Sequence, residues 1–340
     1  MLDRRDFSRL ALIAAPALTA LGAAPARRPI LKPRKLEQGD AVAMIVPASM
    51  VFEADHVDRG REQLEALGYR VKVGAAAKAR HGNLAGTDQQ RADDVNRFFA
   101  DPEVKAVVAY SGGWGTPRLL PLLDYDLIRK NPKVLIGFSD ITGLLNAVHR
   151  MTGLVTFHGP NADSLYEPYT LSNYRRVVMS TEPIGILANP AKRDDELIDR
   201  QNRIVTLREG VATGRLVGGN LTLVAATIGS PYEIETDGAI LFLEDTHEEL
   251  YRIDRMLTQL WLAKKLDRLA GFIFGRCTDC PISGPSLSMG EILRERFSHV
   301  PSIWGLSFGH IEKKLTMPIG LPATLDATAK TLTIAEAAVS

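Results

Sequence analysis

Three residues in this sequence have side chains that together can turn an alcohol into a nucleophile: Ser139, Glu244 and His310. A serine hydroxyl needs a base near neutral pH, a neutral imidazole can take its proton, and a carboxylate can hold the imidazole in the useful tautomer. The order of the three along the chain is free, because such triads are defined by geometry. These residue types favour acyl transfer through a covalent intermediate.

Each of the three residues also has a structural alternative. Ser139 could be the N-cap of a helix that begins at Ile141, a common use of serine. Glu244 could neutralise an arginine such as Arg252, and His310 is one of seven histidines, any of which could have a satisfied role in the core. Residue type alone therefore leaves both interpretations open.

The glycine-rich segment "SGGWG" (residues 111–115) favours the catalytic interpretation. Consecutive glycines allow backbone N–H groups to approach a ligand, and together with the N–H of Asp140 they could bind an oxyanion. We therefore take Gly112, Gly113, Asp140 and Trp114 as candidate oxyanion and substrate-binding residues.

The elements that must position these residues are strand ends. Residues 134–136 are a short apolar run typical of a buried strand, and helical spacing begins directly after residues 137–140. Glu244 immediately follows the apolar run at residues 239–243, and His310 lies in the glycine-bearing loop "SFGHIEKK". Each candidate thus comes from the end of a predicted strand.

Strands and helices alternate through the first half of the chain. Strands are predicted at residues 41–47, 69–73, 104–110 and 134–136, and helices at 55–68 and 87–102, the second opened by a Thr87/Gln90 capping box. This alternation predicts an α/β fold with a parallel sheet covered on both faces. Ligands of such sheets bind beyond the carboxyl ends of the strands, where "SGGWG" and "GFSD" lie.

The chain is long enough for two domains. We expect an N-terminal α/β nucleophile domain at residues 36–160 and a linker region at 161–203, where the pattern weakens and charge rises. A C-terminal α/β domain at 204–338 would carry Glu244 and His310. It contains strands at 239–243 and 269–275 and helices at 248–266 and near 289–297.

The first 26 residues resemble an export signal. Arg4 and Arg5 form a twin-arginine core, an apolar stretch follows from Leu10 to Ala24, and small residues end the segment. The apolar run is too short for a comfortable membrane span. We therefore expect a periplasmic protein with no stable membrane insertion after the signal is removed.

Composition and motifs exclude several classes of partner. Lys and Arg total 41 against 40 Asp and Glu, so no global basic field would attract nucleic acid. Cys277 and Cys280 form a C-x-x-C pair that could be redox-active or bind zinc, although plain thiols or a local disulfide fit better. No H-E-x-x-H accompanies His247-Glu248, and no nucleotide-binding glycine motif is present. We expect no metal and no cofactor.

At these residues the sequence resembles the LD-carboxypeptidase family of serine peptidases. The matching segments span nearly all of the chain after the signal and include "SGGWGTPRLLPLLDYD", "NPKVLIGFSDITGLLNAV", "GRLVGGNLTLV", "ILFLEDTHEELYRIDRML" and "SFGHIEKKLTMPIG". The resemblance implies an N-terminal α/β sandwich, a C-terminal domain of its own type and a catalytic cleft between them. It also allows a homodimer.

Residue by residue, the resemblance implies a nucleophile at Ser139, a carboxylate at Glu244 and a histidine at His310. It assigns the oxyanion contribution to Gly112-Gly113 and the amide of Asp140. One departure is in the glycine loop, which usually reads R-G-G-Y-G in the family but here has Ser111 and Trp114 in place of the arginine and tyrosine. The backbone function survives this change, whereas substrate contacts of the arginine do not.

The function implied is hydrolysis of the amide bond between an L-centre and a terminal D-amino acid of a small peptide, such as D-Ala release from a murein tetrapeptide. One alternative is a related serine amidase acting on a peptidyl-nucleotide or another acyl conjugate. An aromatic platform for a base would favour it, and Trp114, Trp261 and Trp304 are the tryptophans available. An alternative of another class is a non-catalytic periplasmic peptide-binding protein.

Overall fold

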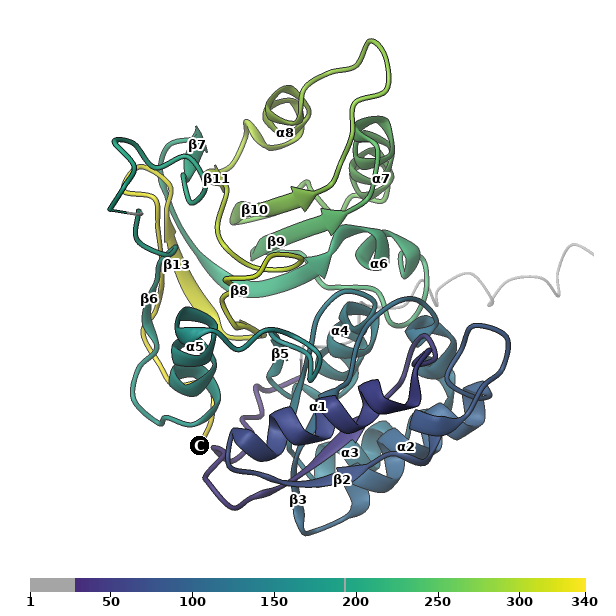
Figure 1. The fold of residues 1–340 in the computed structure, drawn as a ribbon. Coiled ribbons are helices and arrows are strands. Elements are labelled where there is room, and N and C mark those ends of the chain that lie inside the picture. Colours follow the sequence, from purple (N-terminus) through teal and green to yellow (C-terminus); the bar gives the residue numbers. More distant parts are fainter. Residues whose placement is uncertain (1–27, 193) are drawn as a thin grey trace, which may run out of the picture.

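The computed structural model describes residues 28–340 except residue 193, and these residues form two β-sheets with flanking helices (Figure 1). The N-terminal lobe lies below the C-terminal lobe in this view. The expected export signal, residues 1–26, lies outside the described residues. Within the described part of the chain, the helices lack the combination of length and apolar character needed to cross a membrane.

The N-terminal sheet has six strands in the order β12-β5-β4-β3-β1-β2. Five of them are parallel, and the sixth, β12, is antiparallel to β5 at one edge. The strands are β1 (Ala41–Ile45), β2 (Arg70–Val73), β3 (Val104–Ala109), β4 (Val134–Gly137), β5 (Thr156–His158) and β12 (Met317–Ile319). β1 and β4 are buried throughout, as their apolar runs predict.

The helices of this lobe connect the parallel strands. They are α1 (Ala54–Ala66), α2 (Asp88–Ala100), α3 (Tyr125–Lys130) and α4 (Ile141–Thr152), with short 3-10 helices at Ala75–Lys78 and Thr116–Leu122. The capping box predicted at Thr87 and Gln90 is present at the start of α2. Gly153 ends α4 in the left-handed conformation that glycine favours.

The C-terminal sheet has eight strands in the order β6-β14-β13-β8-β9-β10-β11-β7. They are β6 (Gly185–Leu187), β7 (Val205–Arg208), β8 (Val211–Asn220), β9 (Ala239–Thr246), β10 (Gly271–Thr278), β11 (Ser302–Trp304), β13 (Pro322–Asp326) and β14 (Thr331–Ile334). β8 to β11 are mutually parallel, whereas the other strands pair antiparallel. The mixed α/β class with two sheets is the one predicted.

Three helices accompany the parallel part of this second sheet: α6 (Leu221–Ala226), α7 (Leu250–Leu262) and α8 (Met289–Phe297). The buried side of α7 is formed by Leu250, Ile253, Leu257 and Leu260, spaced as an amphipathic helix requires. These residues belong to a core cluster of their own, next to the larger cluster that joins both sheets.

The segment expected to be a linker, residues 161–203, is partly folded, which corrects that expectation. It contains α5 (Pro168–Val178), whose Tyr174 is buried and donates its hydroxyl to that of Tyr69 at 3.2 Å. Pro168 at the first helical position and the Glu167 cap are ordinary start signals that the charged sequence after α5 obscured.

The predicted domain boundary also differs from the structure at the other end of the chain. β12 lies inside the predicted C-terminal domain but pairs with β5 of the N-terminal sheet. Three residues are too few to show a strand period in a sequence. The loop that carries His310 therefore leads directly into the sheet that carries Ser139.

Direct hydrogen bonds hold the two sheets together near these residues. Asn220 at the end of β8 donates its backbone N–H to Thr142 Oγ1 at 3.0 Å. Asn146 of α4 donates its side-chain amide to the carbonyl of Gly218 at 2.8 Å. The carboxyl ends of β4 and β8 thus meet at one edge.

Candidate active site

Ser139 lies in the turn between β4 and α4 with a φ of +66°. For a residue with a side chain this left-handed conformation costs roughly 1–2 kcal/mol, and such strain is typical of functional turns. Asp140 occupies the N-cap position of α4. The hydroxyl of Ser139 points instead to another side chain, so the alternative of a helix-capping serine is wrong.

That other side chain is His310. Its Nε2 lies 2.9 Å from Ser139 Oγ, and its Nδ1 lies 2.7 Å from Glu244 Oε2. The backbone N–H of His310 donates to the same carboxylate oxygen at 3.2 Å. Glu244 is fully buried and the imidazole is 19% exposed. The three predicted residues therefore form one continuous hydrogen-bonded chain from a buried carboxylate to an accessible hydroxyl.

The electrostatics of Glu244 suit its place at the inner end of this chain. Burial alone would raise the pKa of the carboxyl, but the neighbouring His158 and His310 outweigh burial and hold its pKa at about 2. Glu244 is therefore ionised near neutral pH and accepts a hydrogen bond from His310 Nδ1. Nε2 is then left free of hydrogen and can accept the proton of Ser139. Arg252 pairs with Glu248, not with Glu244.

The glycine loop lies directly against Ser139. A Cβ atom at Gly112 would lie 2.7 Å from Ser139 Cβ and 3.2 Å from the backbone nitrogen of Asp140. Gly113 has a φ of +110°, and a Cβ there would lie 2.1 Å from Ser49 Oγ. Only glycine allows the backbone to approach this closely. The structure thus places Gly112 and the Asp140 amide beside Ser139, whereas Gly113 packs against Ser49.

The other two predicted side chains take different positions. The carboxylate of Asp140 points away from a substrate role, since it accepts the backbone N–H of Thr116 at 2.8 Å, and burial raises its pKa. Trp114 donates its backbone N–H to Ser49 Oγ at 3.1 Å, and its side chain is 47% exposed. Asp140 therefore has only its backbone N–H near Gly112, and Trp114 is half-exposed in the loop.

Comparison with known proteins agrees with this geometry. Residues 42–159 match the profile of the LD-carboxypeptidase N-terminal domain, and residues 213–325 match that of the LD-carboxypeptidase C-terminal domain. A probable murein peptide carboxypeptidase of Bacillus subtilis (strain 168) is 40% identical over 319 residues, which cover 91% of this chain and 95% of that one. The chain belongs to the LD-carboxypeptidase family. Carboxypeptidase activity follows from this membership.

Further relatives extend the match. The murein tetrapeptide carboxypeptidase of Pseudomonas aeruginosa is 35% identical to this LD-carboxypeptidase family member over 291 residues, covering 84% of this chain and 92% of that one. The solved structure of MccF in complex with glutamyl sulfamoyl guanosine superposes with a TM-score of 0.82 at 28% identity. That match covers 91% of this chain and all of the other. The two-domain architecture is therefore that of the family.

His158 is a residue of this family member's site that sequence reasoning missed. It is buried at the end of β5, with Nε2 3.7 Å from Glu244 Oε1, on the side of the carboxylate opposite His310. The ring of Phe138 lies edge-on to both imidazoles. A histidine directly after a short strand, in "TFHGP", was the available signal.

Lys314 was also missed. Its side chain is buried, and Nζ lies 4.1 Å from the centre of the Phe138 ring, a cation–π contact. Burial lowers its pKa to about 8, against the opposing charges of Asp163 and Glu244. In the sequence it stands next to the exposed Lys313 and looks like a surface charge.

The two cysteines form a disulfide, Cys277–Cys280, so the local-disulfide alternative is the one this structure adopts. Thr278, inside the closed loop, donates its hydroxyl to the carbonyl of His310 at 2.8 Å. The disulfide loop thereby supports the backbone of the histidine. In the described part of the chain, the side chains close enough to share a metal ion are Glu53, Asp55 and His56, an exposed group outside the hydrogen-bonded chain.

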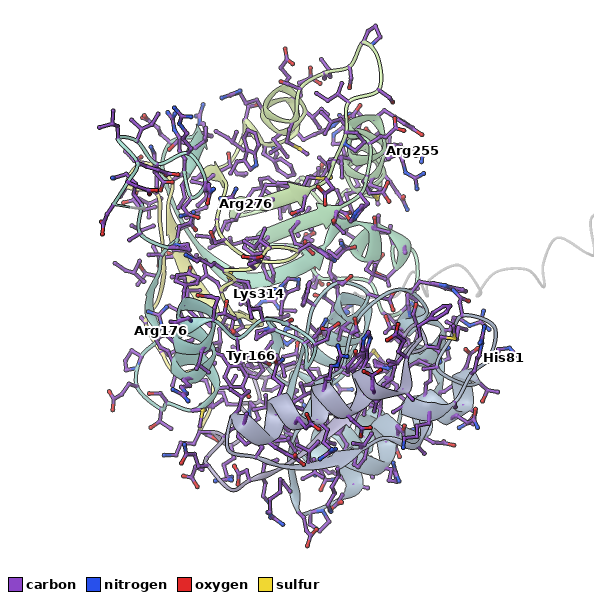
Figure 2. The ribbon with its side chains drawn as sticks, viewed as in Figure 1. His81, Tyr166, Arg176, Arg255, Arg276 and Lys314 are labelled. Carbon is purple, nitrogen blue, oxygen red and sulfur yellow. A yellow bond between two sulfur atoms is a disulfide. The ribbon has the colours of Figure 1, made fainter. Side chains whose placement is uncertain are left out.

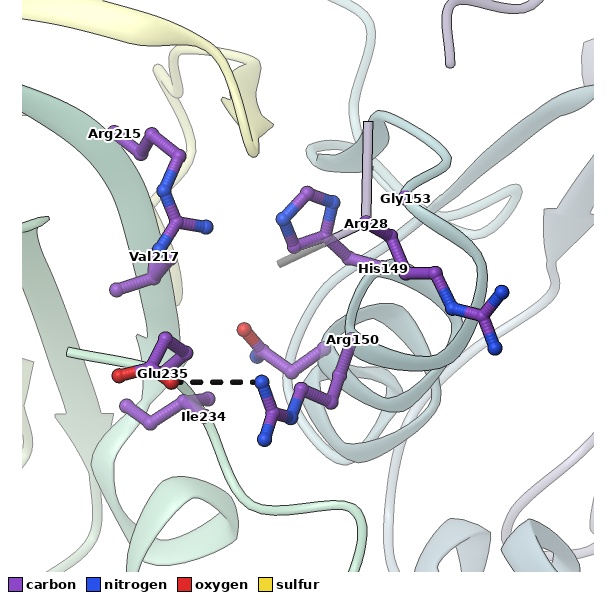
Figure 3. Close-up of a pocket in the computed structure, with 9 residues that line it drawn as sticks. Arg28, His149, Arg150, Gly153, Arg215, Val217, Ile234 and Glu235 are labelled. Atoms are coloured by element: carbon purple, nitrogen blue, oxygen red, sulfur yellow. Dashed lines mark hydrogen bonds and ion pairs between the residues drawn. The ribbon is translucent and has the colours of Figure 1, made fainter. Parts of the chain in front are cut away.

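A separate enclosed pocket lies between α4 and β8 (Figure 3). Its walls include His149, Arg150, Arg215 and Glu235, and the dashed line in Figure 3 marks the 3.5 Å ion pair between Arg150 and Glu235. Burial lowers the pKa of His149 to about 4, so its imidazole is neutral near pH 7. The cavity measures about 30 Å³, enough for water but not for a peptide. The substrate must bind elsewhere.

Proposed function

We propose that the protein is a serine-type LD-carboxypeptidase that cleaves the amide bond between an L-centre and a terminal D-amino acid. The observation that carries this proposal is the hydrogen-bonded chain from Glu244 through His310 to Ser139, with distances of 2.7 and 2.9 Å. Such a chain activates a hydroxyl without a metal or an organic cofactor.

In the proposed mechanism, Ser139 Oγ attacks the amide carbonyl while His310 Nε2 takes the hydroxyl proton. The backbone N–H groups of the Gly112-Gly113 segment and Asp140 stabilise the tetrahedral oxyanion. His310 then protonates the departing amine, and the acyl group stays on Ser139. Water activated by the same imidazole releases the shortened peptide, while Glu244 stays ionised and orients the ring.

The proposed substrate is a murein tetrapeptide, from which the enzyme releases D-Ala. Two relatives of this chain, in Bacillus subtilis and Pseudomonas aeruginosa, are named as murein peptide and murein tetrapeptide carboxypeptidases. Their identities of 40% and 35% extend over both domains and support a shared substrate class.

We also infer a place of action. Arg4, Arg5 and the apolar segment that follows them support export by the twin-arginine route and work in the periplasm. A murein-processing enzyme in that compartment meets its substrate directly.

A related amidase activity on a peptidyl-nucleotide is the second candidate. The solved MccF structure holds glutamyl sulfamoyl guanosine, an acyl group joined to a nucleoside. In this chain Trp304 lines a hollow that adjoins the site, where an aromatic ring could stack on a base. Parallel assays with a murein tetrapeptide and an aminoacyl sulfamoyl nucleoside distinguish the two candidates.

The test of the proposed function is Ser139→Ala, compared with Ser286→Ala in an exposed loop as a matched control. We expect Ser139→Ala to lower kcat for D-Ala release by several orders of magnitude, and His310→Ala to be nearly as damaging with little further loss in the double variant. The control variant should match the wild type, and EDTA should leave the rate unchanged.

Fluorophosphonate labelling gives an independent readout, because only an activated serine reacts and a non-catalytic binding protein would not be labelled. If Ser139→Ala kept more than about a tenth of the wild-type kcat, Ser139 would not be the nucleophile.

A further inference from the structure

The carboxyl ends of the four parallel strands in the C-terminal sheet form a row of polar and aromatic residues. In the spatial order β8, β9, β10, β11 these strands carry Asn220, Glu244, Arg276 and Trp304. Trp304 pairs with Phe274, and Phe274 pairs with Leu243, so Trp304 lies two strands from β9 at the level of the residue before Glu244. The proposed mechanism uses Glu244 but assigns nothing to Arg276 or Trp304.

An irregularity in β10 places Arg276. Phe274 pairs with Leu243 of β9, and Cys277 pairs with Asp245, so Gly275 and Arg276 together oppose the single residue Glu244. This is the pattern of a β-bulge, which redirects a side chain and is common beside active sites. The bulge thus places Arg276 opposite Glu244 in the strand register and changes the direction of its side chain from that in a regular strand.

Two adjoining hollows show where Arg276 is exposed. One, of about 390 Å³, is lined by His310 and Arg276, and the other, of about 530 Å³, is lined by Arg276 and Trp304. Arg276 therefore lines both hollows, one together with His310 and the other together with Trp304. Figure 2 shows Arg276 beside β10, with Lys314 below it on the side of the N-terminal sheet.

Arg276 is partly buried, yet its guanidinium forms no hydrogen bond or ion pair with residues 28–192 and 194–340. Burial lowers its pKa, and the charge of Asp199, which lies outside ion-pair distance, opposes this only in part. Two other arginines of limited exposure differ. Arg91 bonds Asp88 and the carbonyl of Pro47, and Arg296 bonds Asp254 and Thr258. The side-chain nitrogens of Arg276 are not among the buried polar atoms of the described residues that lack a partner, so they reach solvent and can donate to a ligand.

We propose that Arg276 forms a carboxylate-binding subsite for the peptide substrate, with Trp304 as its aromatic wall. A guanidinium binds a carboxylate through two parallel hydrogen bonds, which fixes the orientation of the bound group. This subsite deepens the function proposed above and rests on it.

Lys314, the buried cation beside the Phe138 ring, is less suited to this role. Its ammonium already faces the Phe138 ring and is balanced by the charge of Asp163. Among the described residues Arg276 faces no aromatic ring, the charge of Asp199 acts on it from beyond ion-pair distance, and it lines the hollow that His310 also lines.

A peptide offers this carboxylate from two sources, the terminal D-residue that is released or an acidic residue in the part that is retained. The experiment therefore uses three peptides: a murein tetrapeptide with both carboxylates free, one with the terminal carboxylate amidated, and one with the glutamate carboxylate amidated. The kcat and KM of wild type, Arg276→Gln and Arg276→Lys are measured on each. Arg255→Gln, an exposed arginine on α7 outside both hollows, has the same charge change and is the control.

We expect wild type to lose about 10- to 100-fold in kcat/KM when the recognised carboxylate is amidated. Arg276→Gln should lose a similar factor on the peptide that has this carboxylate, mainly through KM, and nothing more on its amide. Arg276→Lys should be intermediate, and Arg255→Gln should match the wild type. The amidated peptide on which wild type shows the same loss of kcat/KM as Arg276→Gln identifies which of the two carboxylates Arg276 binds.

Two results would overturn the subsite: an equal loss of kcat/KM by Arg276→Gln on all three peptides, or no loss on any. Thermal midpoints of the variants show whether a loss of kcat/KM comes from unfolding. If Arg276→Gln is unfolded, the same comparison of the three peptides is made with Arg276→Lys. If wild type hydrolysed none of the peptides, the proposed function would fail instead. The subsite is then tested by calorimetric Kd values for the three peptides with Ser139→Ala and Ser139→Ala/Arg276→Gln, where Arg276→Gln should weaken only carboxylate-dependent binding.

Discussion

Gly309, the residue before His310, offers a sharp test of the position of the buried carboxylate. Its φ is +87°, and a Cβ atom there would lie 2.2 Å from Oε2 and 2.4 Å from Cδ of Glu244. Ordinary contact begins at 3.4 Å, so Gly309→Ala must push the carboxylate and the backbone apart by 3.4 − 2.2 = 1.2 Å. Oε2 is the atom that holds His310 Nδ1 at 2.7 Å, so this bond is lost or badly misaligned.

We expect the displacement to lower kcat by about 100-fold or more, because a misplacement of about 1 Å in a catalytic group has that effect. Stability should fall as well. Overpacking of a tight site costs about 1–3 kcal/mol, and the left-handed backbone adds roughly 1–2 kcal/mol once a side chain is present.

Gly238→Ala is the matched control. Gly238 also has a positive φ, of +62°, but a Cβ there would meet no atom within 4 Å, so this variant bears only the backbone cost. Steady-state kcat on a tetrapeptide and urea unfolding are measured for both variants. If Gly309→Ala kept a kcat within about threefold of Gly238→Ala, the contact between Glu244 and His310 would not be needed for turnover, and our reasoning about the triad would be wrong.

Two further predictions concern charge and location. The pKa of Glu244 is about 2 in the folded protein against an ordinary 4.5. This lowering of the pKa stabilises the fold by on the order of 3 kcal/mol above pH 4.5, and the stabilisation is lost as pH falls towards 2. The unfolding free energies of wild type and Glu244→Gln should therefore converge over that range, whereas a constant difference would argue against an ionised Glu244. Replacing Arg4 and Arg5 by lysine should leave the precursor in the cytoplasm with active enzyme in lysates, and unchanged periplasmic activity would refute the twin-arginine signal.

Local sequence signals predicted the part of the site that follows strands. Val134–Ile136 is β-branched and apolar, and helical spacing begins at Ile141, so the turn that holds Ser139 could be placed within a few residues. Glu244 was recognisable for the same reason, because an acid directly after an apolar strand is brought to the sheet edge. The distances that join these residues to His310 were not in the sequence, since they depend on how the two sheets meet.

The residues that were missed have in common that packing between distant segments determines their surroundings. Lys314 is buried because β12 returns to the N-terminal sheet, and neither its neighbours in "EKKL" nor the three-residue strand reveals this. Arg276, which our proposal adds to the site, lies at a shift of one residue in the pairing of β10 with β9 and lines a hollow with His310. A sequence shows which side chains lie in a strand, but the position of a bulge depends on the partner strand.

Glu244 and Asp245 show how the fold gives two adjacent carboxyl groups different charges. Successive side chains of a strand point to opposite faces, so only Glu244 faces His310 and His158, and its pKa is about 2. Burial and the charge of Glu244 raise the pKa of Asp245 to about 6, although it accepts a hydrogen bond from Asn220 at 3.0 Å. As pH falls below about 6, Asp245 takes up the proton first, which relieves the repulsion between the pair. The negative charge thus stays on Glu244, the carboxylate that lies 2.7 Å from His310 Nδ1, while Asp245 becomes neutral.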